Sequence, residues 1–242
     1  MTLNERSVVI MNKQVGLATA LVATVGILAA TPGQLHAAGT GGGRAHHKPT
    51  KGRAKAAPHT VADSWKPKPA LLDKLGDEVP AGGFHLRLPT GYVAAGTQSQ
   101  DTGVNGTLTV NMYAAPAPGN PQPNVIHLLM TDGSRFNVGA GAEGALEHLM
   151  TASEQGALNA IPGKQDIVTS PMEFGHIHGL TAARQYFKFS YREPTGGPYQ
   201  AHGFFYGVLT EDGALMVIGL GVEPGSKEAL PIMEAAALTI RQ

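Results

Sequence analysis

The chain has 242 residues, and its 18 Lys and Arg residues balance 18 Asp and Glu residues, a length that suits one domain with additional segments. It contains no cysteine, which excludes disulfides, cysteine nucleophiles and a lipid-modified cysteine anchor. The core must therefore stabilise the fold without disulfide bonds.

The first part of the sequence has the pattern of an export signal. Val15–Ala30 is largely apolar, follows Lys13, and leads to small residues before Gly39. A basic start, an apolar run of about 7–15 residues and a small-residue cleavage site are typical of a secretory signal peptide. Residues 1–38 are therefore predicted to be one, with Met11 as an alternative start, and the protein is expected to be periplasmic or secreted. An uncleaved membrane anchor is the alternative, although a sixteen-residue run is shorter than the roughly 20 residues that span a bilayer.

Charge is unevenly distributed behind this signal. Residues 39–68 hold seven Lys or Arg residues and one acid, whereas the chain from Pro69 onward holds nine basic and sixteen acidic residues. The Gly, Ala and Pro content of residues 39–68 predicts a disordered tether, because such a segment cannot bury apolar surface. It is either a spacer from a membrane or cell wall, which could act as a structural tether in its own right, or an electrostatic contact with an anionic surface. Trp65 is its only aromatic residue, so stacking on nucleic-acid bases is not expected.

Residues 69–242 are predicted to form a single α+β domain around a three-strand antiparallel meander. Thr181–Tyr191 and Gln200–Leu209 alternate from one face to the other with a period of two, which is typical of half-buried strands. Ala214–Leu220 is apolar on both faces, which predicts a central strand covered on each side. Eight of the thirteen Phe and Tyr residues fall between Tyr186 and Tyr206, so we expect the core there.

Other elements are expected on either side of the meander. Two segments have apolar residues at helical spacing, Glu143–Gly156 and Glu228–Ile240, and are predicted helices. Four further segments are predicted strands: Phe84–Pro89, Thr107–Tyr113, Val125–Met130 and Ile167–Phe174.

The order of these elements resembles that of the PsbP-like family. The resemblance covers about residues 80–242 and rests on a Phe-x-Leu-x-Leu-Pro-x-Gly-Tyr opening at Phe84, the sequence Gly-His-Ile-His-Gly-Leu-Thr-Ala-Ala-Arg leading into the meander, and a last helix ending in Leu-Thr-Ile. It implies an antiparallel sheet packed between helices in an α/β/α sandwich. It also implies a non-catalytic binding or assembly factor. The family offers no motif whose functional residues could be transferred to this chain.

One glycine-rich segment matches part of a dinucleotide-binding fingerprint. Gly139–Gly144 fits G-x-G-x-x-G before a predicted helix, and Asp166 follows at about the distance of a ribose ligand. A Rossmann unit also requires parallel βαβ repeats, whereas hairpins follow here. No nucleotide or other cofactor is therefore expected.

Three histidines form the basis of an alternative function. His176 and His178 are two residues apart, and His202 lies in the next predicted strand. If they converged, their imidazoles could bind zinc or copper in an exported metal-dependent hydrolase. The alternative without a metal is that these side chains face solvent. We expect no metal, because no third ligand stands at a diagnostic spacing.

The sequence contains no recognisable catalytic constellation. It lacks a G-x-S-x-G elbow, and Glu143 and Glu147 lie off the apolar stripe of their helix, as expected for a solvated face. We therefore expect no catalytic residues. The predicted function is non-enzymatic binding of a protein or envelope component. The predicted surface is the sheet face that carries Arg184, Tyr186 and Lys188, if no helix covers it.

Overall fold

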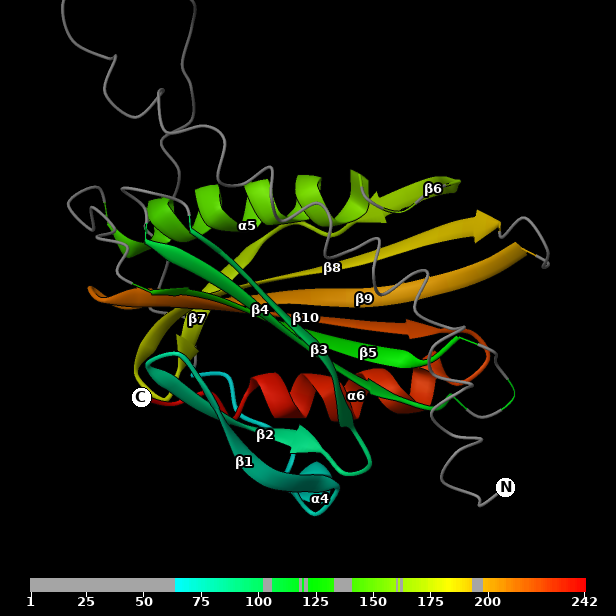
Figure 1. Ribbon diagram of the computed structural model, residues 1–242, viewed down its shortest axis with the longest axis horizontal. Coiled ribbons are helices and arrows are strands. Elements are labelled where there is room, and N and C mark those ends of the chain that lie inside the picture. Colours follow the sequence, from blue (N-terminus) through cyan, green and yellow to red (C-terminus); the bar gives the residue numbers. More distant parts are fainter. Residues whose placement is uncertain are drawn as a thin grey trace, which may run out of the picture.

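One large antiparallel sheet dominates the structure (Figure 1). The structure is a computed structural model that describes residues 64–101, 106–117, 119, 122–132, 141–159, 161, 163–192 and 198–242. The predicted signal peptide and residues 39–63 of the predicted tether lie outside the described residues. The eight-stranded sheet has the order β3-β4-β5-β10-β9-β8-β6, and β7 also pairs with β8. Its strands are β3 (Val93–Asp101), β4 (Thr107–Ala115), β5 (Asn124–Asp132), β6 (Lys164–Thr169), β7 (Glu173–Ile177), β8 (Leu180–Arg192), β9 (Pro198–Leu209) and β10 (Gly213–Val222).

The meander predicted from the aromatic alternation is confirmed. β8, β9 and β10 are antiparallel neighbours, so that Arg184 lies opposite Tyr206, which in turn lies opposite Val217. All ten residues of β10 are buried. This agrees with its unbroken apolar sequence, because β5 and β9 flank the strand and both of its faces are covered.

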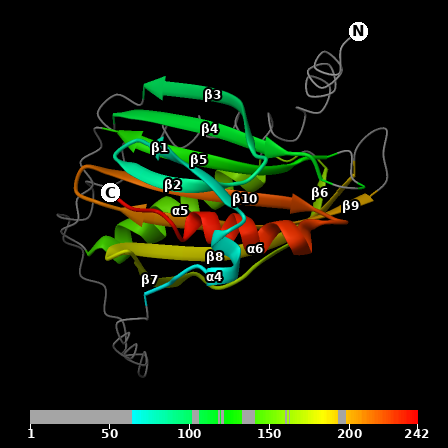
Figure 2. The same cartoon turned by 90° about the horizontal axis from the view of Figure 1, so that it is seen from below.

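Different elements cover the two faces of the sheet (Figures 1 and 2). On one face α5 (Ala142–Asn159) packs on β8 and β9. On the other face lie α6 (Ser226–Ala237), the hairpin of β1 (Leu75–Ala81) and β2 (Phe84–Pro89), and the short α4 (Pro69–Leu72). The core is therefore divided by the sheet, with Phe187, Phe205 and Leu146 on the α5 side and Phe204, Tyr206 and Met233 on the α6 side.

The expected α/β/α sandwich is wrong. Strands account for 56% of the described residues and helices for 22%, in three helices, one of which has four residues. The physical reason lies on the α6 side, where the β1–β2 hairpin covers sheet surface that a second long helix would cover in a sandwich. Phe84 and Leu86 of β2 are almost fully buried there. The fold is a sheet-dominated antiparallel architecture, and none of the helices in the described part of the chain is long and apolar enough to cross a membrane.

One expected strand is broken into two. The segment predicted as Ile167–Phe174 is divided between β6 and β7, with Ser170–Met172 between them. Pro171 has no N–H to donate to a ladder. Ser170, between the two strands, stays bound to β8. Its N–H donates to the Tyr186 carbonyl, and its Oγ accepts from the Tyr186 N–H. The two predicted helices are present as α5 and α6.

Candidate functional site

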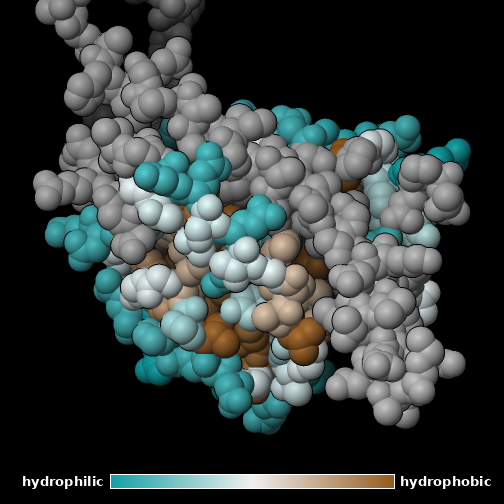
Figure 3. Space-filling view, viewed as in Figure 1, coloured by the Kyte–Doolittle hydropathy of each residue, from teal (hydrophilic) through white to brown (hydrophobic). Residues whose placement is uncertain are grey.

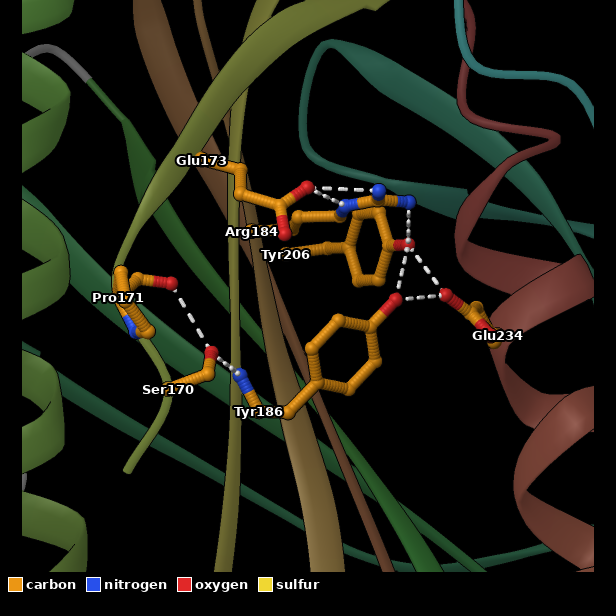
Figure 4. A network of polar contacts seen from close by, with 7 residues as sticks. All are labelled: Ser170, Pro171, Glu173, Arg184, Tyr186, Tyr206 and Glu234. Carbon is orange, nitrogen blue, oxygen red and sulfur yellow. Dashed lines mark hydrogen bonds and ion pairs between the residues drawn. The ribbon is translucent and has the colours of Figure 1, made fainter. Parts of the chain in front are cut away.

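A half-buried network of polar side chains connects β7, β8, β9 and α6 (Figure 4). Arg184 on β8 donates from Nε and Nη2 to Oε2 of Glu173 on β7, at 2.9 and 2.7 Å. Its Nη1 donates to the hydroxyl of Tyr206 on β9 at 3.4 Å. The antiparallel register produces this arrangement, because Arg184 lies opposite both Glu173 and Tyr206.

Two tyrosine hydroxyls of the network converge on one carboxylate. Tyr206 donates to Oε1 of Glu234 at 2.6 Å, and Tyr186 donates to the same oxygen. Burial, and then the hydrogen bond and charge of Glu234, raise the pKa of Tyr186 to about 12 and also raise the pKa of Tyr206. Both phenols are therefore protonated at neutral pH and act as hydrogen-bond donors. The arrangement ties α6 to the sheet. Glu173 compensates the charge of Arg184, and the two hydroxyl groups satisfy the Glu234 carboxylate.

Trp65 covers the outer side of this network. Its ring lies 4.5 Å from the guanidinium carbon of Arg184, measured to the ring centroid, and contacts the Tyr206 ring edge-on at 5.9 Å. The backbone N–H of Trp65 donates to the carbonyl of His176 on β7 at 2.8 Å. Sequence reasoning placed Trp65 in the tether, whereas the structure places it on the domain.

The predicted binding surface is only partly open. Tyr186 is bound to Glu234 of α6, and Arg184 is half-buried between Glu173 and Trp65. Lys188 is exposed. The condition attached to this prediction, that no helix covers the face, therefore fails at Tyr186 and holds at Lys188.

Sequence reasoning missed Glu173, Glu234 and Trp65. A signal for Glu234 was available, since it occupies the apolar stripe of α6 with Leu230, Met233 and Ala237 at helical spacing. A carboxylate on such a stripe needs a partner within the fold. Glu173 and Trp65 carry no comparable signal, because only the register of β7 places them beside Arg184.

The three histidines of the alternative function are not brought together. His176 lies opposite Thr181 and His202 lies opposite Lys188, seven residues further along β8, which corresponds to roughly 23 Å. His178 is exposed in the β7–β8 turn with a φ of 49°, and His202 Nε2 lies 3.1 Å from Glu223 Oε1. Within the described residues, no three His, Asp or Glu side chains are placed to hold a metal ion.

His176 instead borders an open hollow of about 540 Å³ at the start of α5. Glu143 and Glu147, both exposed as predicted, line the α5 side of the hollow, and Phe174 lines the opposite side. Gly141 and Gly144 of the glycine-rich motif also line it, whereas Gly139 lies outside the described residues. No parallel strand follows α5, so this segment does not form the βαβ unit that a dinucleotide fingerprint requires.

The two edges of the large sheet carry the exposed large apolar side chains of the described residues. These are Val93 on β3, which is 50% exposed, and Ile167 and Val168 on β6, at 40% and 52%. In Figure 3, apolar side chains gather in the middle of the view, where β2, α6 and the lower end of β3 lie in Figure 1, with hydrophilic residues to the left and below. Apolar surface at a sheet edge, beside unpaired backbone groups, is typical of a site for strand pairing.

Comparison with known proteins does not assign the chain to a family. No family model and no curated protein matches it, and the resemblance to the PsbP-like family stays a prediction. Among solved structures, a protein of unknown function from Pseudomonas aeruginosa aligns with a TM-score of 0.37 and 13% identity, over 69% of this chain and 96% of its own. A Bacteroides thetaiotaomicron protein aligns with a TM-score of 0.34 and 15% identity, over 69% of this chain and 48% of its own. This chain thus spans about half the length of the second protein, and neither likeness carries a functional conclusion.

Proposed function

We propose that the chain is an exported, non-enzymatic domain that binds a protein of the cell envelope by adding a strand to β3. The observation that carries this proposal is the character of β3 as an edge strand. It has nine residues, eight of them exposed, and none of the described residues pairs with its outer side. An extended segment of a partner could therefore bind through main-chain hydrogen bonds.

From Gly96 to Asp101 the sequence of β3 favours strand addition, because the usual defences are missing from this part of the strand. Natural edge strands carry lysine, proline or bulges that block edge-to-edge pairing. From Gly96 to Asp101 the strand has neither lysine nor proline, and its register against β4 is regular beyond one irregularity at Ala94–Gly96.

The opposite edge of the sheet is less suited to the same role. β6 contains Lys164, its register against β8 shifts between Gln165 and Val168, and Asp166 has a φ of 53°. This irregularity interrupts the straight row of donors and acceptors that a new strand requires. We therefore assign the partner to β3.

Export and tethering are part of the same proposal. The sequence favours removal of residues 1–38 and a basic spacer that leaves the domain at a distance from a membrane or wall. Mass spectrometry of the protein from its native host should find a mature chain beginning close to Gly39, outside the cytoplasm. A cytoplasmic, unprocessed chain would contradict this part of the proposal.

The binding proposal is tested by site-specific photo-crosslinking of the full chain in its host. A crosslinker at Gln98, in the middle of β3, should give one discrete adduct, whereas a crosslinker at Glu147, on the exposed side of α5, should not. Gln100→Lys should abolish the adduct by placing a charge on the edge. It should change the free energy of unfolding by no more than about 0.5 kcal/mol, because Gln100 is exposed. Equal adducts at both positions, or an adduct that Gln100→Lys leaves unchanged, would refute the assignment to β3.

A further inference from the structure

The start of the described chain adds a short piece of parallel strand to the free edge of β7. Ser64 forms a parallel bridge with His176, and the backbone N–H of Trp65 donates to the His176 carbonyl. We refer to Ser64–Lys66 as the strap. Its only aromatic side chain, Trp65, is also the only tryptophan in the protein.

The Trp65 ring occupies a notch whose shape depends on one glycine. A Cβ atom on Gly175 would lie 2.7 Å from Cε2 of Trp65, closer than non-bonded carbon atoms approach. Gly175 does not have a positive φ, so space rather than backbone conformation accounts for a glycine here. The floor of the notch is therefore fitted to a large flat ring.

The walls of the notch suit an aromatic ring for electrostatic reasons. The Arg184 guanidinium lies over the face of the indole, and the Tyr206 ring meets it edge-on at 84°. Cation–π attraction is strongest with tryptophan among the aromatic side chains, and edge-to-face contact is a favoured aromatic geometry. The notch thus combines shape and charge that select tryptophan.

The walls are held by contacts that do not involve the strap. Arg184 is fixed by Glu173 and Tyr206, and Tyr206 is fixed by Glu234. The strap is less embedded, since Ser64 and Lys66 are exposed and Trp65 is half-buried. The notch would therefore keep its form when the strap leaves, as a preorganised site does.

We propose that the notch is a docking site for a tryptophan carried on an extended segment that runs parallel to β7, and that the strap occupies this site in cis. A partner protein with such a segment binds only after the strap has been displaced, so the strap acts as an autoinhibitory contact. This site lies on β7 and is independent of the proposed role of β3 at the other edge of the sheet.

The test uses the full chain with Trp65→Ala and a fluorescein-labelled peptide that copies residues 60–68. Fluorescence anisotropy should show saturable binding to this variant and at least about tenfold weaker binding to the wild type, whose notch is filled. A peptide with alanine in place of tryptophan should bind at least about tenfold more weakly to the same variant.

Two glycine substitutions in the Trp65→Ala background give the matched control. Gly175→Ala fills the floor of the notch and should weaken peptide binding at least about tenfold. Gly144→Ala adds the same methyl group on α5, where nothing lies within 4 Å, and should leave binding unchanged.

Three results would overturn the proposal. They are no saturable binding to a folded Trp65→Ala variant, equal binding of the alanine peptide, and no effect of Gly175→Ala. Folding is checked by circular dichroism and a cooperative thermal transition, with Trp65→Leu as a second variant that retains part of the packing. If neither variant folds, the strap is an integral part of the core and not a displaceable segment, which also overturns the proposal.

Discussion

The buried imidazole of His127 should make the stability of the protein depend on pH. His127 lies on β5 between Met112 of β4 and Ile218 of β10 and is 1% exposed. Its Nε2 has no hydrogen-bond partner among the described residues. Burial lowers its pKa from the ordinary 6.5 to about 4, because the charged imidazolium would lose its hydration.

The sign and size of the effect follow from proton linkage. Below pH 6.5 the unfolded chain binds a proton at this residue and the folded chain does not, so acidification favours unfolding. Each pH unit between 6.5 and 4 removes about 1.4 kcal/mol from the free energy of unfolding, and the whole interval removes about 3 kcal/mol. Below about pH 4 the folded form also binds the proton, and the loss reaches its limit.

The assay is urea unfolding at several pH values between 7.5 and 4.5, followed by circular dichroism, for the wild type and for His127→Leu. Between pH 7 and pH 5 the wild type should lose about 2 kcal/mol more than the variant. His127→Gln is the control, because it keeps a polar side chain that does not titrate. It should be destabilised by about 1–3 kcal/mol at every pH but lose the extra pH dependence. A wild type and two variants with parallel pH profiles would refute the reasoning.

Four further predictions concern the polar network and two glycines, one in the sheet and one in α5. Glu234→Gln should lower the free energy of unfolding by about 1–3 kcal/mol, measured by thermal unfolding, since a charged acceptor of two hydroxyls is lost. An unchanged transition would argue against the role of Glu234 in tying α6 to the sheet. In the same variant the pKa of Tyr186, now about 12, should fall in an ultraviolet titration but stay above 10, because burial is its largest cause. Gly203→Ala places a methyl group 2.3 Å from the Phe187 ring and 2.4 Å from the Gly219 carbonyl oxygen, so it should cost roughly 3 kcal/mol or more in urea unfolding. Gly144→Ala in α5 should be neutral or stabilising by up to about 1 kcal/mol, and equal effects of the two glycine substitutions would contradict the packing argument.

The central strands could be predicted from the sequence because their signal is local. β8 and β9 alternate between two cores, and β10 is buried on both sides, so burial is recorded in the residues themselves. β3 was not predicted because neither of its faces is buried, which leaves Thr97–Gln100 without any apolar period. Its pairing with β4 alone makes it a strand. β1 was missed for a related reason, since Pro80 and two acids interrupt its pattern.

The candidate site was predictable only in part, because the sequence records local patterns and not which distant segments come together. The sequence indicated that Arg184 and Tyr186 share a sheet face, which is correct because that relation depends only on a period of two. It could not indicate what covers the face. Trp65 lies 119 positions before Arg184, and Glu234 lies 48 positions after Tyr186. The hypothesis of converging histidines failed because strand register, which sequence spacing does not reveal, separates His176 from His202 along β8.

The position of β10 has a consequence for how the protein forms. Strands β3 to β5 are sequential neighbours, as are β8 to β10, and the two groups meet only where β5 pairs with β10. In that pairing Val125 lies opposite Leu220, so the two strands join positions that are nearly a hundred residues apart in the sequence. Closing so large a loop is slow in comparison with forming hairpins. Until β10 has formed, β5 presents an apolar open edge. The export proposed above would therefore require that the chain be protected from aggregation until almost all of it had left the membrane pore.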